Sequence, residues 1–299
     1  MEFNFKDEKS RKLFEKKLNH SKSKNRNHNK GYKKRDIFDI DKTKIPKDTR
    51  AILKEFKDID NFHLKLNKFA KFNHEKGYKL QNQNINEKFF YKDKDWSFYN
   101  KQIKNYYKDI ETLNLNFSDP IELKTNYRLV IGSEESIYET SIRLHHIYGI
   151  PYIPASAIKG VVRSYMIYKY FEEELNEYKD RYNKFEEEVL FNDDDFKNYF
   201  GTPNEEGKII FFDAFPITKP KIKIDIMNPH YGHYYNDGKA PTDTKNPIPI
   251  NFLTVEETEF KFFIASKDEV DSSFISLFKE ALQNHGIGGK TAVGYGYFN

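Results

Sequence analysis

The chain has 299 residues, with 50 lysines and arginines against 46 aspartates and glutamates, so its formal net charge at pH 7 is +4. Hydrophobic residues make up 37% of it, enough for a sizeable core, and much of this share comes from 27 phenylalanines and 21 tyrosines. Cysteine is absent, which excludes disulfides, thiolate nucleophiles and cysteine-ligated zinc. No apolar run is long enough to span a membrane and no export leader follows Met1, so we expect a soluble, cytoplasmic protein.

The N-terminal part of the chain is polar and basic. From Lys9 to Arg35 the only acidic residue is Glu15, which predicts a solvated, partly flexible segment over residues 1–45 that attracts polyanions. A solubilising tail would carry the same charge, so that alternative stays open. Residues 46–115 show short helical patterns and an aromatic patch that we expect to pack on the rest of the chain: Phe89, Phe90, Tyr91, Trp96, Phe98 and Tyr99.

From residue 121 the hydrophobic pattern becomes regular. Residues 121–132 alternate as a strand does, and a loop then runs to Pro154. Ser156 is suited to cap a helix. The apolar face of that helix has helical spacing, with Ile158, Val161, Val162, Tyr165 and Met166. The charged stretch 172–198 extends or follows this helix.

The rest of the sequence predicts further strands and a second helix. Residues 208–217 and 259–266 predict two strands, separated by a proline-punctuated excursion at 218–251. A second helix follows, begun by Asp271 or Ser272 and ended by Gly286, with an apolar stripe of Phe274, Leu277, Phe278, Ala281 and Leu282. Residues 291–298 predict a last short strand.

The predicted fold class is therefore α+β. The order of elements is that of a ferredoxin-like or RRM-like βαββαβ core, with an N-terminal helical extension. A long insertion, 218–251, separates the second and third strands of the core, which spans 121–299.

The glycine-rich end of the chain, GIGGKTAVGYG, raises the question of a nucleotide site. A P-loop requires a glycine where Asn284 stands, and it joins a strand to a helix rather than a helix to a strand. Two interpretations remain: a close-packed structural turn, or a loop whose backbone N–H groups and lysine bind phosphate. The second makes RNA contacts of Gly286, Gly288, Gly289, Lys290 and Thr291.

The predicted helix entry after Pro154 also favours RNA. A helix N-terminus presents free N–H groups to an anion, and Ser156, Lys159 and Arg163 lie within its first turns. Arg143, His145 and His146 precede it and join the candidate RNA contacts. The paired histidines are alternatively a general acid and base for RNA cleavage, or structural.

Within the excursion, DIMNPHYGHYYNDG carries a His230-x-x-His233 pair between Asp225 and Asp237. No helical or strand register brings these groups together, so we expect neither a metal nor any other cofactor. An aromatic surface for a partner or for bases is the preferred interpretation. Its candidate RNA-binding residues are Lys219, Lys221, His230, Tyr231, Tyr234 and Tyr235.

Four motifs in this order resemble one known family. GIPYIPASAIKGVVRS, FFDAFPI, DIMNPHYGHYY with NPIPINFL, and GIGGKTAVGYG are similar to motifs of the repeat-associated RAMP proteins of CRISPR systems, most of all the Cmr subunit six family of type III-B complexes. The resemblance covers about 121–299. One departure is Ala155-Ser156, where family members commonly have Gly-Ser.

The resemblance implies a non-catalytic, Cas7-like RNA-binding subunit of an antiviral ribonucleoprotein. Such a subunit lies near the 3′ end of the guide RNA, against the repeated backbone subunit and the small subunit, and supports pairing of guide and target RNA. The excursion would correspond to a thumb-like extension. Two alternatives stay open: a Cas6-like, metal-independent endoribonuclease that processes guide RNA, and a generic single-stranded RNA binder.

Overall fold

The computed structural model describes residues 43–53, 59–69, 72, 93–132, 137–138, 142–228 and 249–299. All of them belong to one compact unit, Asp36–Asn299. No helix in these ranges is long and apolar enough to cross a membrane. The basic segment 9–35, the aromatic residues Phe89, Phe90 and Tyr91, and the predicted contacts His230, Tyr231, Tyr234 and Tyr235 lie outside the described residues.

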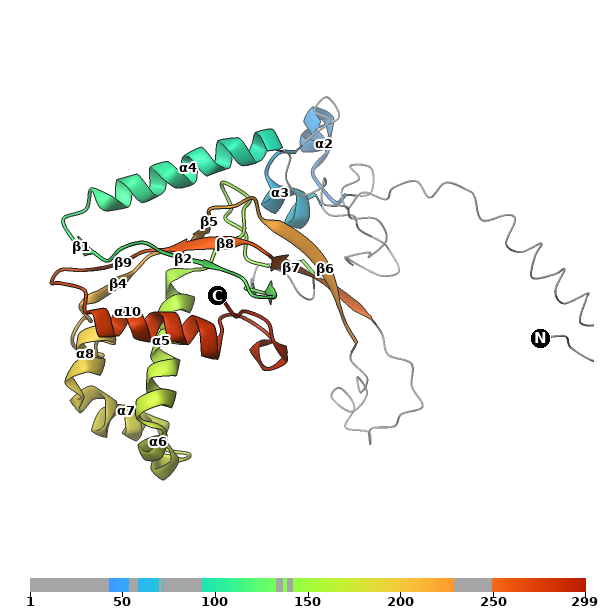
Figure 1. Cartoon of the computed structure of the whole chain (residues 1–299). Helices are drawn as coiled ribbons and strands as arrows, with labels where there is room; N and C mark the ends of the chain where they lie inside the picture. The colour runs from blue at the N-terminus through green and yellow to red at the C-terminus, as the bar shows by residue number, and fades with distance from the viewer. Residues whose placement is uncertain are drawn as a thin grey trace, which may run out of the picture. The chain divides into compact units, whose positions relative to one another are not determined.

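The fold mixes α-helices with small antiparallel sheets (Figure 1). The three middle strands follow one another along the chain: β7 (Ile250–Glu256), β8 (Glu259–Phe262) and β9 (Ile264–Ser266). On one side they pair with β3 (Arg128–Leu129), β2 (Ile121–Lys124) and β1 (Asn116–Phe117). On the other side they pair with β6 (Lys221–Met227), β5 (Phe215–Pro216) and β4 (Ile209–Phe211). The predicted α+β mixture is thus confirmed at this level, although each predicted strand is divided.

The predicted insertion 218–251 begins and ends in strands, which were not predicted. β6 and β7 pair over seven residues, from Lys221 opposite Glu256 to Met227 opposite Ile250. Because neighbouring side chains on a strand point to opposite faces, Ile222, Ile224 and Ile226 line one face. Lysines and Asp225 line the other.

The predicted strand at 291–298 was also wrong in part. Residues Thr291–Val293 form a 3₁₀ turn, η4, because Lys290, Gly294 and Gly296 all have positive φ angles and turn the chain repeatedly. Only the last residues are extended. Phe298 bridges Thr125, and Asn299 and Lys124 exchange backbone hydrogen bonds of 3.0 Å.

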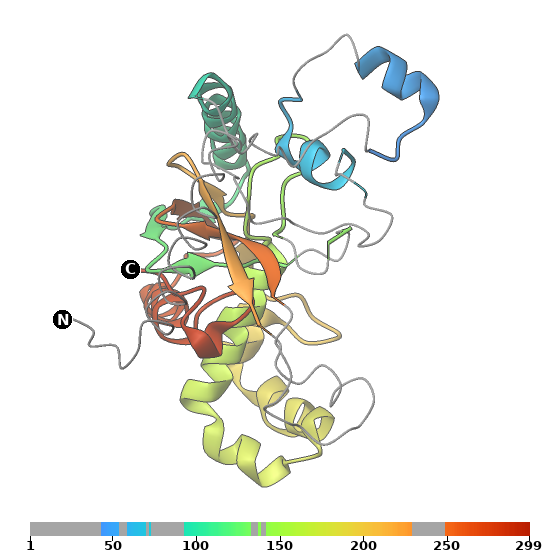
Figure 2. The ribbon, with the colours of Figure 1, turned by 90° about the vertical axis from the view of Figure 1, so that its right-hand side faces the viewer.

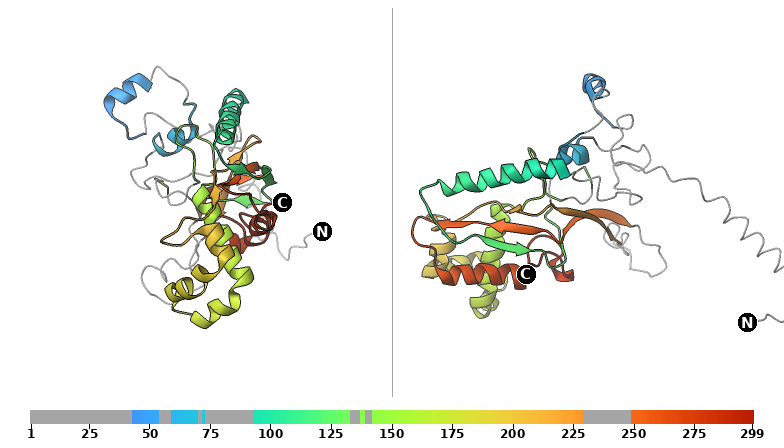
Figure 3. Two further views of the ribbon diagram at one scale, coloured as in Figure 1. Left: turned by 90° about the vertical axis from the view of Figure 1, so that its left-hand side faces the viewer. Right: turned by 45° about the horizontal axis from the view of Figure 1, so that its top comes forward.

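Two predicted helices are confirmed and lie on the same side of the sheet (Figures 1 and 3). α5 (Ala155–Tyr170) buries its apolar face as expected, except that Val161 is half-buried. α10 (Ser272–Glu280) begins at Asp271, whose carboxylate accepts the Ser273 N–H, and continues as the π-helix η3 (Ala281–His285). Gly286, at φ 74°, ends it.

The charged stretch after α5 follows that helix as a group of short helices (Figure 2). They are α6 (Glu172–Tyr178), α7 (Tyr182–Glu188), η2 (Leu190–Asn192) and α8 (Asp194–Phe200). Each of these elements is short, and α6, α7 and α8 are rich in acidic residues, so local helix propensity alone would stabilise them poorly. Burial of Phe185, Leu190 and Phe196 holds the group to the core.

On the opposite side of the sheet lies α4 (Asp93–Glu111), which buries Tyr99, Ile103, Tyr107 and Ile110. The smaller helices α2 (Lys47–Leu53) and α3 (Phe62–Asn67) precede it. Asn61 caps α3 through the Leu64 N–H and also donates to the carbonyls of His146 and Ile147 at 2.7 and 2.8 Å. This side chain joins α3 to the turn that carries the two histidines.

Candidate nucleic-acid interface

Three segments that are distant in the sequence meet beside the end of β3. The Gly289 N–H donates to the Val130 carbonyl at 2.8 Å, and the Arg143 N–H donates to the Ile131 carbonyl at 2.6 Å. We call the set formed by residues 130–132, 142–143 and 288–290 the junction. It brings together four of the predicted RNA contacts: Arg143, Gly288, Gly289 and Lys290.

Glycines make the junction possible. Gly288 has φ 94°, and a Cβ there would collide with the Val130 carbonyl oxygen; Gly296 has φ 80° and faces the Ile287 carbonyl in the same way. Both positions therefore require glycine for conformation and for space. Gly288 and Gly289 are nonetheless exposed, so the segment packs on β3 and also presents backbone to solvent.

The two cations of the junction have no carboxylate partner among the residues that the structure describes. The Lys290 Nζ lies 5.2 Å from the centroid of the Phe252 ring and 3.3 Å from the Met227 sulfur. The Arg143 Nε donates to the Gly132 carbonyl at 3.4 Å. Neither side chain forms an ion pair with any residue that the structure describes. Uncompensated charge beside bare backbone suits a polyanion.

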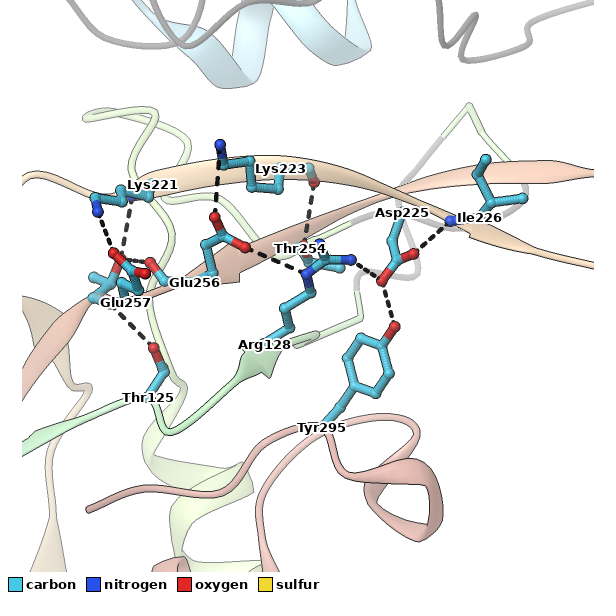
Figure 4. Close-up of polar contacts among 11 residues, drawn as sticks. Thr125, Arg128, Lys221, Lys223, Asp225, Ile226, Thr254, Glu256, Glu257 and Tyr295 are labelled. Atoms are coloured by element: carbon cyan, nitrogen blue, oxygen red, sulfur yellow. Dashed lines mark hydrogen bonds and ion pairs between the residues drawn. The ribbon is translucent and has the colours of Figure 1, made fainter.

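A polar network fixes the glycine-rich segment against the β6–β7 pair (Figure 4). Arg128 forms ion pairs with Asp225 and, at 3.3 Å, with Glu256. The Tyr295 hydroxyl donates to Asp225, which also accepts the Ile226 N–H at 2.8 Å. Two carboxylates, Asp225 and Glu256, thereby join β3, β6, β7 and the C-terminal segment.

The pKa values of Asp225 and Tyr295 in this network are shifted in opposite directions. Burial would raise the pKa of Asp225, but hydrogen bonds from Tyr295, the Ile226 N–H and Arg128 outweigh it and lower that pKa. Burial and the hydrogen bond to Asp225 raise the pKa of Tyr295 to about 12. At neutral pH the carboxylate is therefore ionised and the phenol is a neutral donor.

The N-terminus of α5 differs from the prediction. Ser156 does not cap it: the N-cap residue is Pro154, and Ser156 is exposed in the first turn. Asp213, from the connection between β4 and β5, accepts the Ala155 N–H at 2.7 Å instead. A carboxylate at this position satisfies the helix dipole and repels a second anion, which disfavours phosphate binding there.

Lys159 and Arg163 are engaged within the protein. The Lys159 Nζ donates to the Phe200 carbonyl at 2.8 Å, at the end of α8. Arg163 forms an ion pair with Glu186 and donates to the Tyr182 hydroxyl at 3.1 Å. These contacts hold the acidic helices to α5, and an RNA contact of either residue stays a prediction.

The two histidines belong to the turn that receives α3. The His145 Nδ1 accepts the Tyr148 N–H at 3.2 Å, and its ring stacks on Tyr148 at 4.7 Å. Burial, followed by the neighbouring His146, lowers the pKa of His145, so its imidazole is neutral. His146 is exposed, and the two rings stack 5.2 Å apart.

The other predicted contacts are dispersed. Lys219 lies in the exposed connection between β5 and β6, and Lys221 forms an ion pair with Glu257. Gly286 is buried at the end of η3, while the half-buried Thr291 opens η4. Among the described residues, no group of three or more metal-binding side chains is present.

Sequence reasoning missed Asp213, Arg128 and Tyr295, and it considered Asp225 only as a metal ligand. Strand register decides these pairings, and a register is set by tertiary packing. The one available signal was the alternation of residues 221–227, which is that of a strand.

Comparison with known proteins gives the family. The model of the RAMP superfamily matches residues 122–299. The CRISPR system Cmr subunit Cmr6 of Pyrococcus furiosus is 38% identical over an alignment of 243 residues that covers 64% of this chain and 71% of that protein. The CRISPR system CMR subunit Cmr6 of Saccharolobus solfataricus is 28% identical over an alignment of 208 residues that covers 66% of this chain and 64% of that protein.

Two solved structures are also similar. A chain in the cryo-EM structure of the Type III-B Cmr-beta bound to cognate target RNA is 24% identical, with a TM-score of 0.49 over 84% of this chain and 72% of that one. The crystal structure of Cmr6 from Pyrococcus furiosus is 34% identical, with a TM-score of 0.40 over 62% of this chain and 98% of that one. Because both TM-scores are below 0.5, the relationship rests on the sequence matches.

Proposed function

The chain belongs to the RAMP superfamily and, within it, to the Cmr6 family, and on this basis we propose that it is a non-catalytic, RNA-binding subunit of a type III-B CRISPR Cmr complex. Its ligands are guide RNA and the target RNA paired with it, and its place is near the 3′ end of the guide. Its protein partners are other Cmr subunits, above all the repeated backbone subunit and the small subunit.

The observation that carries the RNA-binding proposal is the junction. Lys290 and Arg143 flank the same backbone segment, residues 130–132, and neither has a carboxylate partner among the described residues. Gly288 and Gly289 leave exposed backbone between them. A basic surface with exposed backbone suits the sugar–phosphate backbone of RNA rather than one particular base.

We further propose that the core is an interrupted ferredoxin-like sheet. The strand pairings support the order 297–299, 116–129, 250–266 and 209–227, in which all neighbours are antiparallel. α5 connects the second of these segments to the fourth, and α10 connects the third to the first. The β6–β7 pair would then be the base of an inserted, thumb-like extension.

The alternative of a guide-processing nuclease has less support. A general base needs a free ring nitrogen within reach of substrate, and the His145 Nδ1 is occupied by the Tyr148 N–H. Incubation of the pure protein with repeat RNA in EDTA tests this alternative. Site-specific cleavage that His146→Ala abolishes would overturn the non-catalytic proposal.

The direct test of RNA binding uses the full chain and a guide RNA at several salt concentrations. We expect Lys290→Ala to weaken binding and to reduce the slope of log K against log salt by about 0.7, because one phosphate contact is lost. Lys279→Ala is the control: it removes the same charge from the exposed side of α10 and should change neither quantity.

The assembly proposal is tested by affinity purification of the chain from cells that express the other Cmr subunits. Recovery of those subunits with a guide RNA is the expected result. Recovery of RNA without any of them would instead favour the generic RNA binder.

A further inference from the structure

One exposed aromatic ring lies beside the junction and was not predicted as a contact. Tyr127, in the turn between β2 and β3, has 51% of its surface exposed. The glycine-rich segment runs alongside it: the Asn126 N–H donates to the Tyr297 carbonyl at 2.8 Å, and the Gly296 N–H donates to the Arg128 carbonyl at 2.7 Å. Tyr127 therefore borders the same edge of the sheet as Gly288 and Gly289.

The ring is held in place before any ligand arrives. It meets Tyr295 in a T-shaped contact, with centroids 5.5 Å apart and an interplanar angle of 68°. The Arg128 guanidinium carbon lies 5.2 Å from the Tyr127 ring centroid. Tyr295 and Arg128 are themselves fixed by Asp225, so little side-chain freedom remains to be lost when the ring is covered.

Charge separates Tyr127 from the other exposed tyrosines of the described residues. Tyr168 and Tyr170 end α5 immediately before the acidic turn Glu172–Glu174, and Tyr182 lies in the acidic helix α7. Around Tyr127 the carboxylates of Asp225 and Glu256 are paired with Arg128, while Lys290, which lies over Phe252, has no carboxylate partner in the described part of the chain. A polyanion meets no unpaired carboxylate of this network there.

We propose that Tyr127 is the stacking platform for one nucleobase of RNA whose backbone lies on the junction; this deepens the proposed function and rests on it. A base offers a π-face to an aromatic ring whatever its identity, so the site takes a splayed or single-stranded nucleotide without sequence preference. Arg128, beside the ring, adds a cation–π contribution. Lys290 and the exposed glycines then receive the neighbouring phosphates.

The test compares two probes on the full-length chain by fluorescence anisotropy: an oligouridine, and an abasic ribose-phosphate strand of the same length. Tyr127→Ala should weaken oligouridine binding by roughly 5- to 150-fold, the range for loss of one base–aromatic stack, and leave binding of the abasic strand unchanged. Tyr127→Phe keeps the ring and should bind both probes as the wild type does. Tyr170→Ala, at a similarly exposed tyrosine, should have no effect.

Every other outcome overturns the stacking site, the proposed function or both. Equal weakening of both probes by Tyr127→Ala, or no weakening of either, would overturn the stacking site and leave RNA binding standing. Failure of the wild type to bind either probe would overturn the proposed function, and the stacking site with it. If Tyr127→Ala binds oligouridine normally but no longer joins the other Cmr subunits, the ring contacts a protein and the proposal is wrong.

Discussion

At the scale of single residues, several polar side chains serve the fold rather than a ligand. Asp213 occupies the N-terminus of α5, and Lys159 and Arg163 bind the short helices that follow it. His145 accepts a backbone N–H within its own turn. At these positions the residue type indicated which charges and hydrogen bonds were available. The partner that each side chain meets in the fold decided whether it serves the structure or a ligand.

His145 predicts a pH dependence of stability. Burial and His146 place its folded pKa below the ordinary value near 6.5, so the unfolded chain binds more protons as pH falls below that value. The contribution of His145 to the stability of the fold is thus fully present at higher pH and is lost as the pH falls. We expect the melting temperature to fall between about pH 7.5 and about pH 5.5, and to fall less in His145→Asn, whose Oδ1 is able to accept the same N–H.

The control for this measurement is His20→Asn, in the N-terminal basic segment. It should keep the wild-type dependence of melting temperature on pH. If the melting temperature changes with pH identically in the wild type and in His145→Asn, His145 contributes nothing to the pH dependence of stability.

At the scale of elements, the glycine-rich segment is an edge piece of the sheet with a solvent face. Its positive φ angles at Gly286, Gly288, Gly294 and Gly296 turn the chain between η3 and the final extended residues. Two of these glycines also accommodate carbonyl oxygens of neighbouring segments. The two interpretations of this segment, structural turn and anion-binding loop, are therefore compatible.

A comparison of two glycines distinguishes the cost of a left-handed backbone from the cost of a steric collision of an added Cβ. Gly294 and Gly296 have similar φ angles of 90° and 80°, but an added Cβ meets nothing within 4 Å at Gly294 and collides with the Ile287 carbonyl at Gly296. Gly294→Ala should lower the free energy of unfolding by about 1–2 kcal/mol, the cost of a left-handed alanine. Gly296→Ala should lower it by a further 1–3 kcal/mol or so, because the backbone must move. Urea unfolding measures both, and equal losses would show that the collision is relieved without cost.

At the scale of the whole described unit, a segment outside the RAMP match completes the core. α4 precedes residue 122, where the family match begins, yet Tyr107 is buried among β5 and β8. Its hydroxyl accepts the Phe215 N–H at 2.9 Å and donates to the Lys261 carbonyl at 2.9 Å. Burial raises the pKa of Tyr107 well above its usual value, so the phenol stays neutral and keeps both bonds.

Removal of this hydroxyl tests the coupling of α4 to the sheet. Tyr107→Phe leaves the Phe215 N–H without its acceptor and should lower the free energy of unfolding by about 1–3 kcal/mol. Tyr127→Phe removes an exposed hydroxyl and should change it by less than about 0.5 kcal/mol. Chemical denaturation of both variants gives the comparison; similar values for the two would mean that water replaces the lost bond.

Much of the helical structure was predictable because its determinants are local. The spacing of Phe274, Leu277 and Phe278, the cap at Asp271 and the stop at Gly286 all act within a few residues, and the structure confirms them. The strand at 259–266 was found but not its interruption at Phe263, which lies between β8 and β9. The predicted capping by Ser156 failed because a distant carboxylate took that place.

By itself, the sequence determined the α+β class, the positions of α5 and α10, the glycine-rich end and the resemblance to RAMP proteins. Hydrophobic period, caps and glycine content are local properties, and a motif order needs no coordinates. Only the tertiary structure decided which charges lack a carboxylate partner within the described ranges. Arg143 and Lys290 are separated by well over a hundred residues, and they flank one strand end because Val130 and Ile131, directly after β3, accept backbone hydrogen bonds from the two segments. Long-range strand pairing made that choice, and it also placed Tyr127 beside them.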